Sequence, residues 1–401
     1  MVRDHRSSDQ LHVVWIYSGS LAAALDSATW LKTTEELRNL GCHVTLVSKG
    51  PSGYQQIHGV EVLCIPRPEV YLLRHVVFHL RVLHLVLSQW ATIDVIVFHE
   101  RSAPWILPLR LVRSLTGKRR PLLVMDTRSL PMEPSNKRTW KEKLRKGAYL
   151  IEKQLGNRCA DGRLAITQRM AKAVGIPTKK LWGIWPSGVD VEHFALARKD
   201  RRWPSPGDSI HLIYHGSLHR ERNLMTLCRA VTRANAEGMS FNLSLVGKGT
   251  ERAKLEDFAA QTHMAVRIVP PVPYEEIPEA LARAHIGVLS FPDEEKFRVS
   301  SPIKLFEYMA AGLPILATRI VCHTDVVGGE EYAFWAEDAS EQGLLDALRL
   351  VWRSRDLLSE MGRQAAIAAE GWTWAASAEK LKKALEQGFQ SLISPMEIEC
   401  L

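Results

Sequence analysis

Residues 301–318 read SPIKLFEYMAAGLPILAT, and this stretch decides the fold of the 401-residue chain. Ser301 suits a helix N-cap and Pro302 suits the first helical position, so we predict a helix from there to Ala311. The apolar run 314–317 that follows is predicted as a strand. A helix that leads directly into a buried strand is typical of a parallel α/β sheet.

Lys304 and Glu307 lie three residues apart in this stretch and therefore share one face near the start of the helix. A cation in that position can meet a phosphate group, and a carboxylate can accept both hydroxyl groups of a ribose. The same pattern also fits an ion pair within the helix, with Leu305 and Met309 in the core. Both interpretations remain open at this point.

The rest of the chain alternates β-branched runs with helical patterns, which implies parallel sheets covered by helices. The predicted strands are Leu11–Tyr17, His43–Ser48, Val60–Cys64, Asp94–Phe98, Pro121–Asp126 and Leu164–Thr167 in the first half, and Ile210–Tyr214, Phe241–Val246, Val266–Val269 and Ile286–Ser290 in the second. Helices are predicted at Leu21–Leu40, Tyr149–Cys159 and Tyr274–Arg283, among others, and a linker at Leu196–Asp208. Ligands bind beyond the carboxyl ends of such strands, so we expect two sheets that face one cleft.

A glycine turn with two arginines follows the strand that ends at Tyr214. Gly216 lets the backbone approach phosphate oxygens, and Arg220 and Arg222 supply bidentate positive charge before a predicted helix start at Asn223. The pattern suits a diphosphate, although glycine turns and surface arginines are both common.

Several segments together resemble one known family. The stretch 301–318 looks like the signature of the retaining glycosyltransferases of family 4, which have the GT-B fold of two Rossmann-like domains. The other similar segments, in the family's order, are Trp185–Asp190 with Phe194, Tyr214–Leu218, Leu245–Gly249, Val266–Ile277, Ala284–Val288 and Thr373–Trp374. The resemblance implies an N-terminal acceptor-side domain at residues 1–187, completed by a helix at about 373–392, and a donor domain at residues 188–372.

The resemblance also implies roles for individual residues. Glu307 would hold the ribose, Arg222 would face the diphosphate with help from Arg220, and backbone near Val272 would read the base. The implied donor-binding set is Gly19, Gly216, Arg220, Arg222, Val272, Ser301, Pro302, Lys304 and Glu307. The implied catalytic set is Asp126, Arg222 and Lys304, and the acceptor-side candidates are His99, Glu100 and Arg128.

The sequence departs from the family pattern at three places. Val299 stands where the family has the first glutamate of its E-x7-E pair, and Pro270 stands in place of a glycine near the base-binding strand. The N-terminal loop has one glycine, Gly19, instead of two. Backbone groups of Ser300 or Ser301 would then take over part of the recognition of the sugar.

The implied reaction transfers a sugar from a UDP- or GDP-sugar to an acceptor hydroxyl with retention, in the synthesis of a glycolipid, polysaccharide or other glycoconjugate. Arg222, Lys304 and the helix start at Pro302 would stabilise the departing diphosphate electrostatically. We expect no cofactor and no metal, because no D-x-D motif or metal-ligand spacing occurs. Two other classes remain open: a GT-B sugar-nucleotide epimerase or phosphorylase, and a non-catalytic relative that binds a nucleotide sugar or a partner glycosyltransferase.

Composition and charge bear on the location of the protein. The chain is 46% hydrophobic and 24% charged, which excludes a disordered chain or a fibre. The stretch with most apolar residues, 75–87, is interrupted by Arg81, and the polar start of the chain, Met1–Gln10, does not resemble a signal peptide. The six cysteines contain no C-x-x-C pair. We therefore expect a cytoplasmic protein.

The net charge of +8 is concentrated in one region. Residues 101–150 contain 13 Lys and Arg against 3 Asp and Glu, mainly at Lys118–Arg120 and Lys137–Lys146, and an apolar helix is predicted just upstream at Val70–Trp90. This composition suits peripheral binding to an anionic membrane at its inner face, and so a carbohydrate or lipid-linked acceptor. A buried helix beside a solvated basic face fits equally well. We expect no nucleic-acid partner, because aromatic residues do not alternate with the basic ones.

Overall fold

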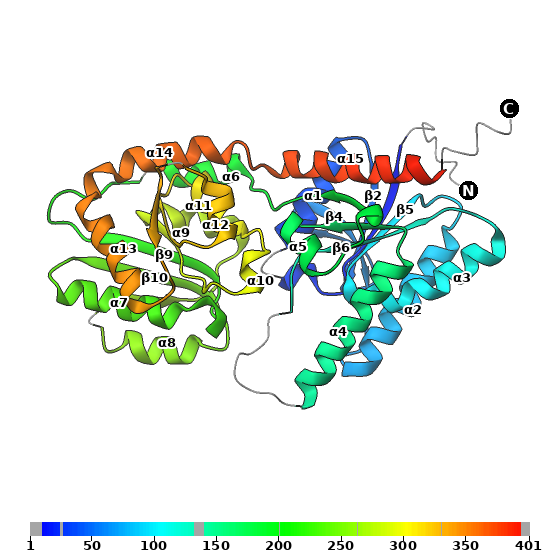
Figure 1. The fold of residues 1–401 in the computed structure, drawn as a ribbon, viewed down its shortest axis with the longest axis horizontal. Helices are drawn as coiled ribbons and strands as arrows, with labels where there is room; N and C mark the ends of the chain where they lie inside the picture. Colours follow the sequence, from blue (N-terminus) through cyan, green and yellow to red (C-terminus); the bar gives the residue numbers. More distant parts are fainter. Residues whose placement is uncertain are drawn as a thin grey trace. The chain divides into compact units, whose positions relative to one another are not determined.

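The computed structural model describes residues 10–24, 27–131, 140–199, 201–262, 264–329 and 331–393, and Figure 1 shows their fold. The chain divides into two compact units. Of the described residues, the first unit contains those up to Pro186 together with Trp374–Ile393, and the second contains Ser187–Thr373. The polar start before residue 10, Cys400 and part of the basic cluster at 137–146 (residues 137–139 and the side chains of residues 141, 142 and 145) lie outside the described residues.

The first unit is built on an eight-stranded sheet with the order β3-β4-β2-β1-β5-β6-β7-β8. Its strands are β1 (His12–Ile16), β2 (His43–Lys49), β3 (Gly53–Ile57), β4 (Val60–Ile65), β5 (Val95–Phe98), β6 (Leu122–Thr127), β7 (Gly162–Ala165) and β8 (Leu181–Ile184). All neighbours pair in parallel except β3 and β4. The two outer strands, β3 and β8, were not predicted, because β3 is polar and both are short.

Helices cover both faces of this sheet. They are α1 (Ala28–Asn39), α2 (Tyr71–Ser88), α3 (Ile106–Thr116), α4 (Trp140–Cys159), α5 (Gln168–Ala173) and α15 (Trp374–Ile393). Residues of α2 and α3 form one hydrophobic core with alternate residues of β1, β5 and β6, and α4 packs against that core. Residues of α1 and α15 form a second core with the intervening residues of the same strands. The last helix, drawn in red in Figure 1, therefore completes the first unit.

The second unit contains a six-stranded parallel sheet with the order β11-β10-β9-β12-β13-β14. Its strands are β9 (Ile210–Ser217), β10 (Phe241–Lys248), β11 (Val266–Val269), β12 (Ile286–Leu289), β13 (Ile315–Thr318) and β14 (Ala333–Ala336). Its helices are α6 (Val191–Ala195), α7 (Leu224–Ala236), α8 (Arg252–Ala259), α9 (Ile277–Ala282), α10 (Glu295–Arg298), α11 (Ile303–Ala310), α12 (Val321–Val327), α13 (Glu341–Arg353) and α14 (Leu358–Ala369). One hydrophobic core joins them.

Some predicted boundaries were wrong. The predicted helix 21–40 is a 3-10 turn, Leu21–Ala23, followed by α1, and the predicted helix 149–159 begins earlier, at Trp140. The stretch 196–208, predicted as a linker, is instead part of the second unit. Arg198 and Arg201 donate hydrogen bonds to the carbonyl groups at the end of α11 and so hold the stretch against that unit. Among the described helices, none has both the length and the apolar character that a membrane crossing requires.

Candidate active site

The second unit gathers glycine turns at the carboxyl ends of β9 and β10. Gly216 has φ +115° and Gly247 has φ +152°, both in the region that favours glycine. A Cβ atom on Gly247 would lie 1.8 Å from the Gly216 carbonyl oxygen, and one on Gly249 would lie 2.1 Å from the Leu218 carbonyl oxygen. The two turns therefore pack backbone against backbone, which only glycine allows.

Gly216 also makes room for Lys304. A Cβ atom on Gly216 would lie 2.5 Å from Lys304 Cε and 2.8 Å from Lys304 Nζ. The ammonium group lies 5.7 Å from the centre of the Tyr214 ring, and burial raises the pKa of Tyr214 to about 12. The predicted glycine turn and the predicted helix thus meet, and Lys304 lies directly over the turn.

Glu307 is buried on the same helix, with 6% of its surface exposed. Its Oε2 atom lies 3.1 Å from Nε2 of His215, the residue before the glycine turn. The backbone N–H of His215 donates to the Tyr308 hydroxyl at 3.2 Å. Glu307 also raises the pKa of Tyr274, where burial is the larger cause. Glu307 is therefore in close contact with the residue that precedes the glycine turn.

Arg222 lies beside the same turn. Its Nε donates to the Ser217 hydroxyl at 3.2 Å, and its guanidinium lies 5.0 Å and 5.3 Å from the ring centres of Phe291 and Phe297. Ser290, at the end of β12, donates its hydroxyl to the Arg222 carbonyl at 3.0 Å. Within the described part of the chain, no carboxylate forms an ion pair with Arg222. The contacts with Ser217 and the two phenylalanine rings hold its charge in place beside the glycine turn.

The start of α11 differs from the prediction. Pro302 is the N-cap and Ser301 is not, because the Ser301 hydroxyl accepts from the Ser187 N–H at 3.1 Å. The Ser187 hydroxyl in turn donates to the Ser301 carbonyl at 2.9 Å. Two hydrogen bonds therefore tie the segment at residue 187 to the helix that carries Lys304 and Glu307.

The remaining donor-side residues lie less centrally. Arg220 is exposed in the 3-10 turn before α7, and Val272 is half-buried in the loop after β11. Val299, in place of the family glutamate, is buried with 5% exposure. The nearby acids do not replace it, since Asp293 pairs with Arg298 and Glu294 pairs with Lys296.

In the first unit, Asp126 lies at the carboxyl end of β6 and is fully buried. Its Oδ1 accepts from Trp185 Nε1 at 3.1 Å, and its Oδ2 has no hydrogen-bond partner among the described residues. Arg128 stacks on Trp185, with its guanidinium carbon 3.6 Å from the ring centre, and donates to the Trp185 carbonyl at 3.2 Å. Asp126 therefore supports Trp185 and, through it, Arg128.

His99 follows β5 and belongs to the same network. Its Nε2 accepts from Trp30 Nε1 at 2.9 Å, so its Nδ1 carries the proton and donates to the Asp126 carbonyl at 3.2 Å. Trp30 stacks near Tyr17, and a Cβ atom on Gly19 would lie 2.8 Å from the Tyr17 ring. His99 thus connects Gly19 to Asp126 through aromatic contacts, and both of its ring nitrogens bond to the protein.

Glu100 lies in a group of buried charges next to this network. Burial raises the pKa of Glu100, while His99, Thr127 and Arg163 favour its charged form. Arg163 is fully buried and donates to the Thr127 hydroxyl at 2.8 Å and to the Met125 carbonyl at 3.3 Å. Burial also raises the pKa of Glu152 on α4 to about 7, with Glu100 adding to the rise and Arg101 opposing it.

Sequence reasoning did not assign roles to three residues of these networks. His215 contacts Glu307, and Trp185 donates a hydrogen bond to Asp126. Arg163 interacts electrostatically with Glu100 and Asp126. His215 and Trp185 lie within segments already compared with the family, so their position next to the motifs was the available signal. Nothing in the sequence around Arg163 marked it, because two of its partners, Met125 and Thr127, are 36 to 38 residues away along the chain.

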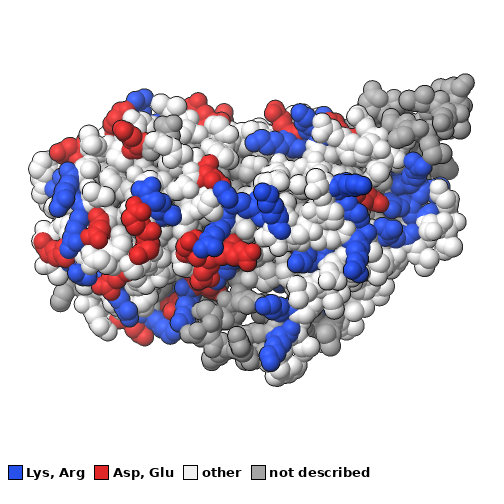
Figure 2. All heavy atoms as spheres, in the orientation of Figure 1, with Lys and Arg blue, Asp and Glu red and all other residues white. Residues whose placement is uncertain are grey.

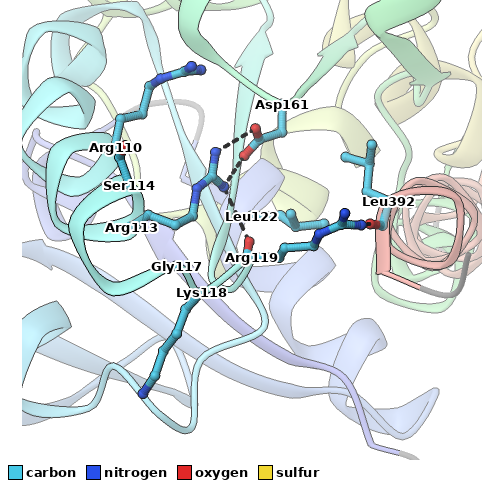
Figure 3. Close-up of a pocket in the computed structure, with 9 residues that line it drawn as sticks. All are labelled: Arg110, Arg113, Ser114, Gly117, Lys118, Arg119, Leu122, Asp161 and Leu392. Atoms are coloured by element: carbon cyan, nitrogen blue, oxygen red, sulfur yellow. Dashed lines mark hydrogen bonds and ion pairs between the residues drawn. The ribbon is translucent and has the colours of Figure 1, made fainter. Parts of the chain in front are cut away.

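A separate cavity lies in the first unit, and Figure 3 shows it. It has a volume of about 540 Å³ and lies near the amino ends of β6 and β7, opposite the end that carries Asp126. Arg113 forms a bidentate ion pair with Asp161 there, at 2.6 and 2.8 Å, while Lys118 points away from that pair (Figure 3). These contacts tie α3 to the sheet, and no predicted site residue lines the cavity.

Comparison with solved structures identifies the class of fold. A sucrose-phosphate synthase from Thermosynechococcus elongatus aligns over 95% of this chain and 100% of its own, with a TM-score of 0.74 and 15% identity. HepE of Anabaena, solved in complex with UDP-glucose, aligns over 94% and 100%, with a TM-score of 0.69 and 13% identity. The chain therefore has the GT-B fold, with two Rossmann-like α/β units.

Comparison of sequences points to a narrower group. Residues 209–354 match the family model described as glycosyl transferases group 1. The chain is 27% identical over 214 residues to a D-inositol 3-phosphate glycosyltransferase of Pseudarthrobacter chlorophenolicus, covering 49% of this chain and 47% of the relative. It is 25% identical over 150 residues to the putative colanic acid biosynthesis glycosyltransferase WcaL of Salmonella typhimurium, covering 37% and 36%. The chain thus spans about half the length, or less, of the curated relatives it matches, and it is similar to GT4-type glycosyltransferases.

Proposed function

We propose that this protein transfers a sugar from a UDP- or GDP-sugar to an acceptor hydroxyl, with retention at the anomeric carbon. One observation carries the proposal: in the second unit, Arg222, Lys304 and Glu307 surround the glycine turn at Gly216. This set provides two cations for a diphosphate and one carboxylate for a ribose. The three side chains lie beside the turn after β9 and on the helix α11.

The two cations suit the chemistry of the leaving group. Loss of a nucleoside diphosphate develops negative charge on its oxygens, and fixed cations stabilise that charge without reorganisation. Arg222 is oriented by Ser217 and by two phenylalanine rings, and Lys304 lies over Gly216. The proposed mechanism needs no metal, and the departing phosphate assists attack on the same face.

Glu307 suits the nucleoside. A buried carboxylate accepts both hydroxyls of a ribose well, because the surroundings are already desolvated. We assign His215 as its positioning residue, since Nε2 lies 3.1 Å from the carboxylate.

The first unit supplies the proposed acceptor side. Because Asp126 is fully buried, we propose that it acts through Trp185 and Arg128 and does not itself touch the sugar. His99 and Gly19 belong to the same network. Their substitution would disturb Asp126 through the hydrogen bond between His99 and the Asp126 carbonyl.

The neighbours support this choice of donor. HepE was solved with UDP, with UDP-glucose, and with UDP and glucose, and a starch synthase IV from Arabidopsis thaliana with ADP and acarbose. The curated relatives carry glycosyltransferase names. For this chain we propose a carbohydrate or lipid-linked acceptor in the cytoplasm.

The test begins with a panel of UDP- and GDP-sugars in a thermal-shift assay, since a ligand that binds only the folded state raises Tm. The donor that raises Tm is then used to measure release of nucleoside diphosphate with and without EDTA. We expect Arg222→Ala and Glu307→Gln each to lower turnover at least 100-fold, about 2.7 kcal/mol, because each removes a charged contact. NMR of the product reports the anomeric configuration.

Arg283→Ala is the matched control, because Arg283 is an exposed arginine of the same unit whose side chain pairs with Glu279, four residues earlier in the chain, and with no other acid among the described residues. Its turnover should equal that of the wild type. Normal turnover in both site variants would refute the assignment. A donor that binds and is never turned over would instead identify a non-catalytic relative, and formation of an isomeric nucleotide sugar would identify an epimerase.

A further inference from the structure

The outer surfaces of α2, α3 and α4 in the first unit carry an unusual number of exposed apolar side chains. Of the 19 large hydrophobic residues that are exposed in the described structure, 12 lie on these helices or at Val70, directly before α2. Contiguous apolar surface of this kind marks an interaction site in a folded protein. We call the outer surface of these three helices the apolar face.

The helix α2 has two apolar sides. Phe78, Val82 and Val86 are buried against the sheet, as expected for a helix of this unit. Leu73 and Leu80, spaced at helical intervals on the other side, are about half exposed. The second side has no structural partner among the described residues, and burial in the core does not explain it.

The helix α3 repeats the pattern. Leu107, Leu111 and Leu115 are spaced four residues apart and form one exposed stripe, with Leu111 61% exposed. Ile106 and Leu109 turn inward to the core that α2 shares. The exposed leucines therefore lie on the outer side of the same layer of helices.

The helix α4 adds a third stripe. Trp140, Leu144 and Ile151 lie at helical spacing, and each is at least 60% exposed. The helix packs with α2 and α3 against one core, and the short 3-10 segment Glu100–Trp105 contacts all three helices. The three stripes thus belong to helices that pack on the same face of the sheet.

The charges around the apolar face are mostly positive, and α4 contains six Lys and Arg residues against two glutamates, Glu142 and Glu152. Neither α2 nor α3 contains an Asp or Glu, and each contains two arginines. Lys118 is exposed just after α3, and Lys143 and Lys146 are exposed on α4. Figure 2 shows blue and white atoms over much of this part of the first unit and few red ones.

We propose that the apolar face binds an anionic lipid bilayer, with leucine and tryptophan side chains in the interface and the surrounding lysines against lipid phosphates. Basic residues around an apolar helix surface favour anionic headgroups. A second copy of the same chain would bring two positively charged faces together, which disfavours self-association. No described helix can cross a membrane, so the helices would lie on the bilayer. The proposal goes beyond sugar transfer and concerns a surface without donor-site residues.

The test is co-sedimentation of the full chain with phosphatidylcholine vesicles that contain 0 or 30% phosphatidylglycerol, without any donor. The compositions are set by the experiment, at roughly the anionic fraction that produces a strong surface potential. We expect binding only to the anionic vesicles. At 1 M salt, where the electrostatic screening length shortens to about 3 Å, binding should be at least tenfold weaker.

Two variants test the two parts of the surface. Leu107→Gln with Leu111→Gln and Leu115→Gln should weaken vesicle binding at least tenfold, because three side chains no longer enter the interface. Lys118→Gln with Lys143→Gln and Lys146→Gln should also weaken it at least tenfold, since each lost cation costs about fivefold. All six side chains point outward, so both variants should melt at the wild-type Tm.

A matched control removes three equally exposed apolar side chains from the second unit: Leu350→Gln, Leu357→Gln and Ile367→Gln. It should bind vesicles as the wild type does. Failure of the wild type to bind anionic vesicles, or equal losses in the control and the α3 variant, would overturn the proposal. A wild-type dimer in sedimentation velocity that the α3 variant abolishes would also overturn it and assign the face to self-association. Donor turnover is measured separately with a soluble acceptor, so failure of lipid binding and failure of sugar transfer remain distinguishable.

Discussion

At the scale of single residues, Gly216 has two reasons to be glycine. Its φ of +115° disfavours any side chain, and a Cβ atom would collide with Lys304. We expect Gly216→Ala to lower the free energy of unfolding of the second unit by about 1 kcal/mol, mainly from backbone strain, because the flexible end of the Lys304 side chain can move aside. Urea denaturation measures this loss.

Gly41→Ala separates the two causes. Gly41 has φ +88° but open space around its Cβ position, so its replacement should cost only the strain, about 1 kcal/mol. Gly216→Ala should cost about as much as Gly41→Ala, both with Lys304 present and in a Lys304→Ala background. A cost of Gly216→Ala that is well above that of Gly41→Ala and falls when Lys304 is absent would contradict this expectation, because it would show that the Lys304 side chain cannot move aside.

Glu152 gives a prediction about pH. Burial raises its pKa to about 7, above the unfolded value of 4.5, so the folded state binds more protons between those values. Stability is then greatest below pH 4.5 as far as Glu152 alone is concerned, and falls as pH rises through 7. Because the side chain is partly exposed to solvent, we expect a loss of roughly 1 kcal/mol between pH 5 and pH 8.

Glu152→Gln should remove most of that pH dependence and stabilise the protein at pH 8. Denaturant unfolding of both forms at pH 5 and pH 8 measures the difference. An unchanged slope with pH in Glu152→Gln would show that another group is responsible, and Glu100, whose pKa burial also raises, is the first to examine.

At the scale of elements, the end of α11 depends on a residue far back in the chain. Arg201 Nη1 donates to the carbonyls of Ala311 and Gly312, both at 2.7 Å, and Nη2 donates to the Leu281 carbonyl at 3.1 Å. Burial lowers the pKa of Arg201 to about 10. Arg201→Leu leaves these carbonyls unsatisfied and should cost about 2–3 kcal/mol of stability.

The neighbouring Arg202 is exposed and serves as the control, so Arg202→Leu should change stability by less than about 0.5 kcal/mol. Because α11 carries Lys304 and Glu307, Arg201→Leu should also weaken donor binding in the thermal-shift assay. A variant with lowered stability and normal donor binding would show that the helix start is held independently, through Ser187.

Helices and strands could be predicted from the sequence wherever the periodicity of apolar residues was strong. Apolar strands such as β9 and β10, and the helix after Ser301, follow from residue patterns alone. The edge strand β3, with Tyr54 and two glutamines, was missed because its polar pattern becomes a strand only through pairing with β4. The predicted linker at 196–208 was wrong because its arginines bind carbonyls that sequence patterns do not bring near.

The candidate site shows the same difference between what residue patterns predict and what only tertiary contacts decide. The proximity of Gly216 and Lys304 could be predicted, because the strand–turn–helix order places both residues at one sheet edge. Their partners were not found, since His215 reaches Glu307 and Trp185 reaches Asp126 only through tertiary contacts. The role of Ser301 was misjudged for the same reason: its hydroxyl bonds to Ser187, 114 residues away.

At the scale of the whole molecule, α15 lies at the far end of the sequence but belongs to the first unit. Ala378, Leu381, Ala384 and Leu385 are buried in the core that β1 and α1 share. Burial of two leucines and their neighbours contributes roughly 5 kcal/mol, comparable with the whole stability of a domain. A chain that stops at Thr373 should therefore lose the calorimetric unfolding transition of the first unit and keep that of the second.

Adding a peptide of residues 374–393 in excess should restore the lost transition, because the shortened chain still contains the residues of α1 and β8 that contact α15 and can fold together with the peptide. The same peptide with Leu381→Asp and Leu385→Asp is the control and should not restore it. Two intact transitions in the shortened chain would contradict a core role for α15.

The position of α15 also has a consequence for synthesis on the ribosome. The strands that precede Pro186 emerge first, yet the helix that covers one face of their sheet emerges only after the whole second unit. Domains generally fold as units in the order in which they leave the ribosome. Here we expect the later unit, Ser187–Thr373, to reach its native state first. During that interval the apolar side chains on the uncovered face of the first sheet are available to chaperones.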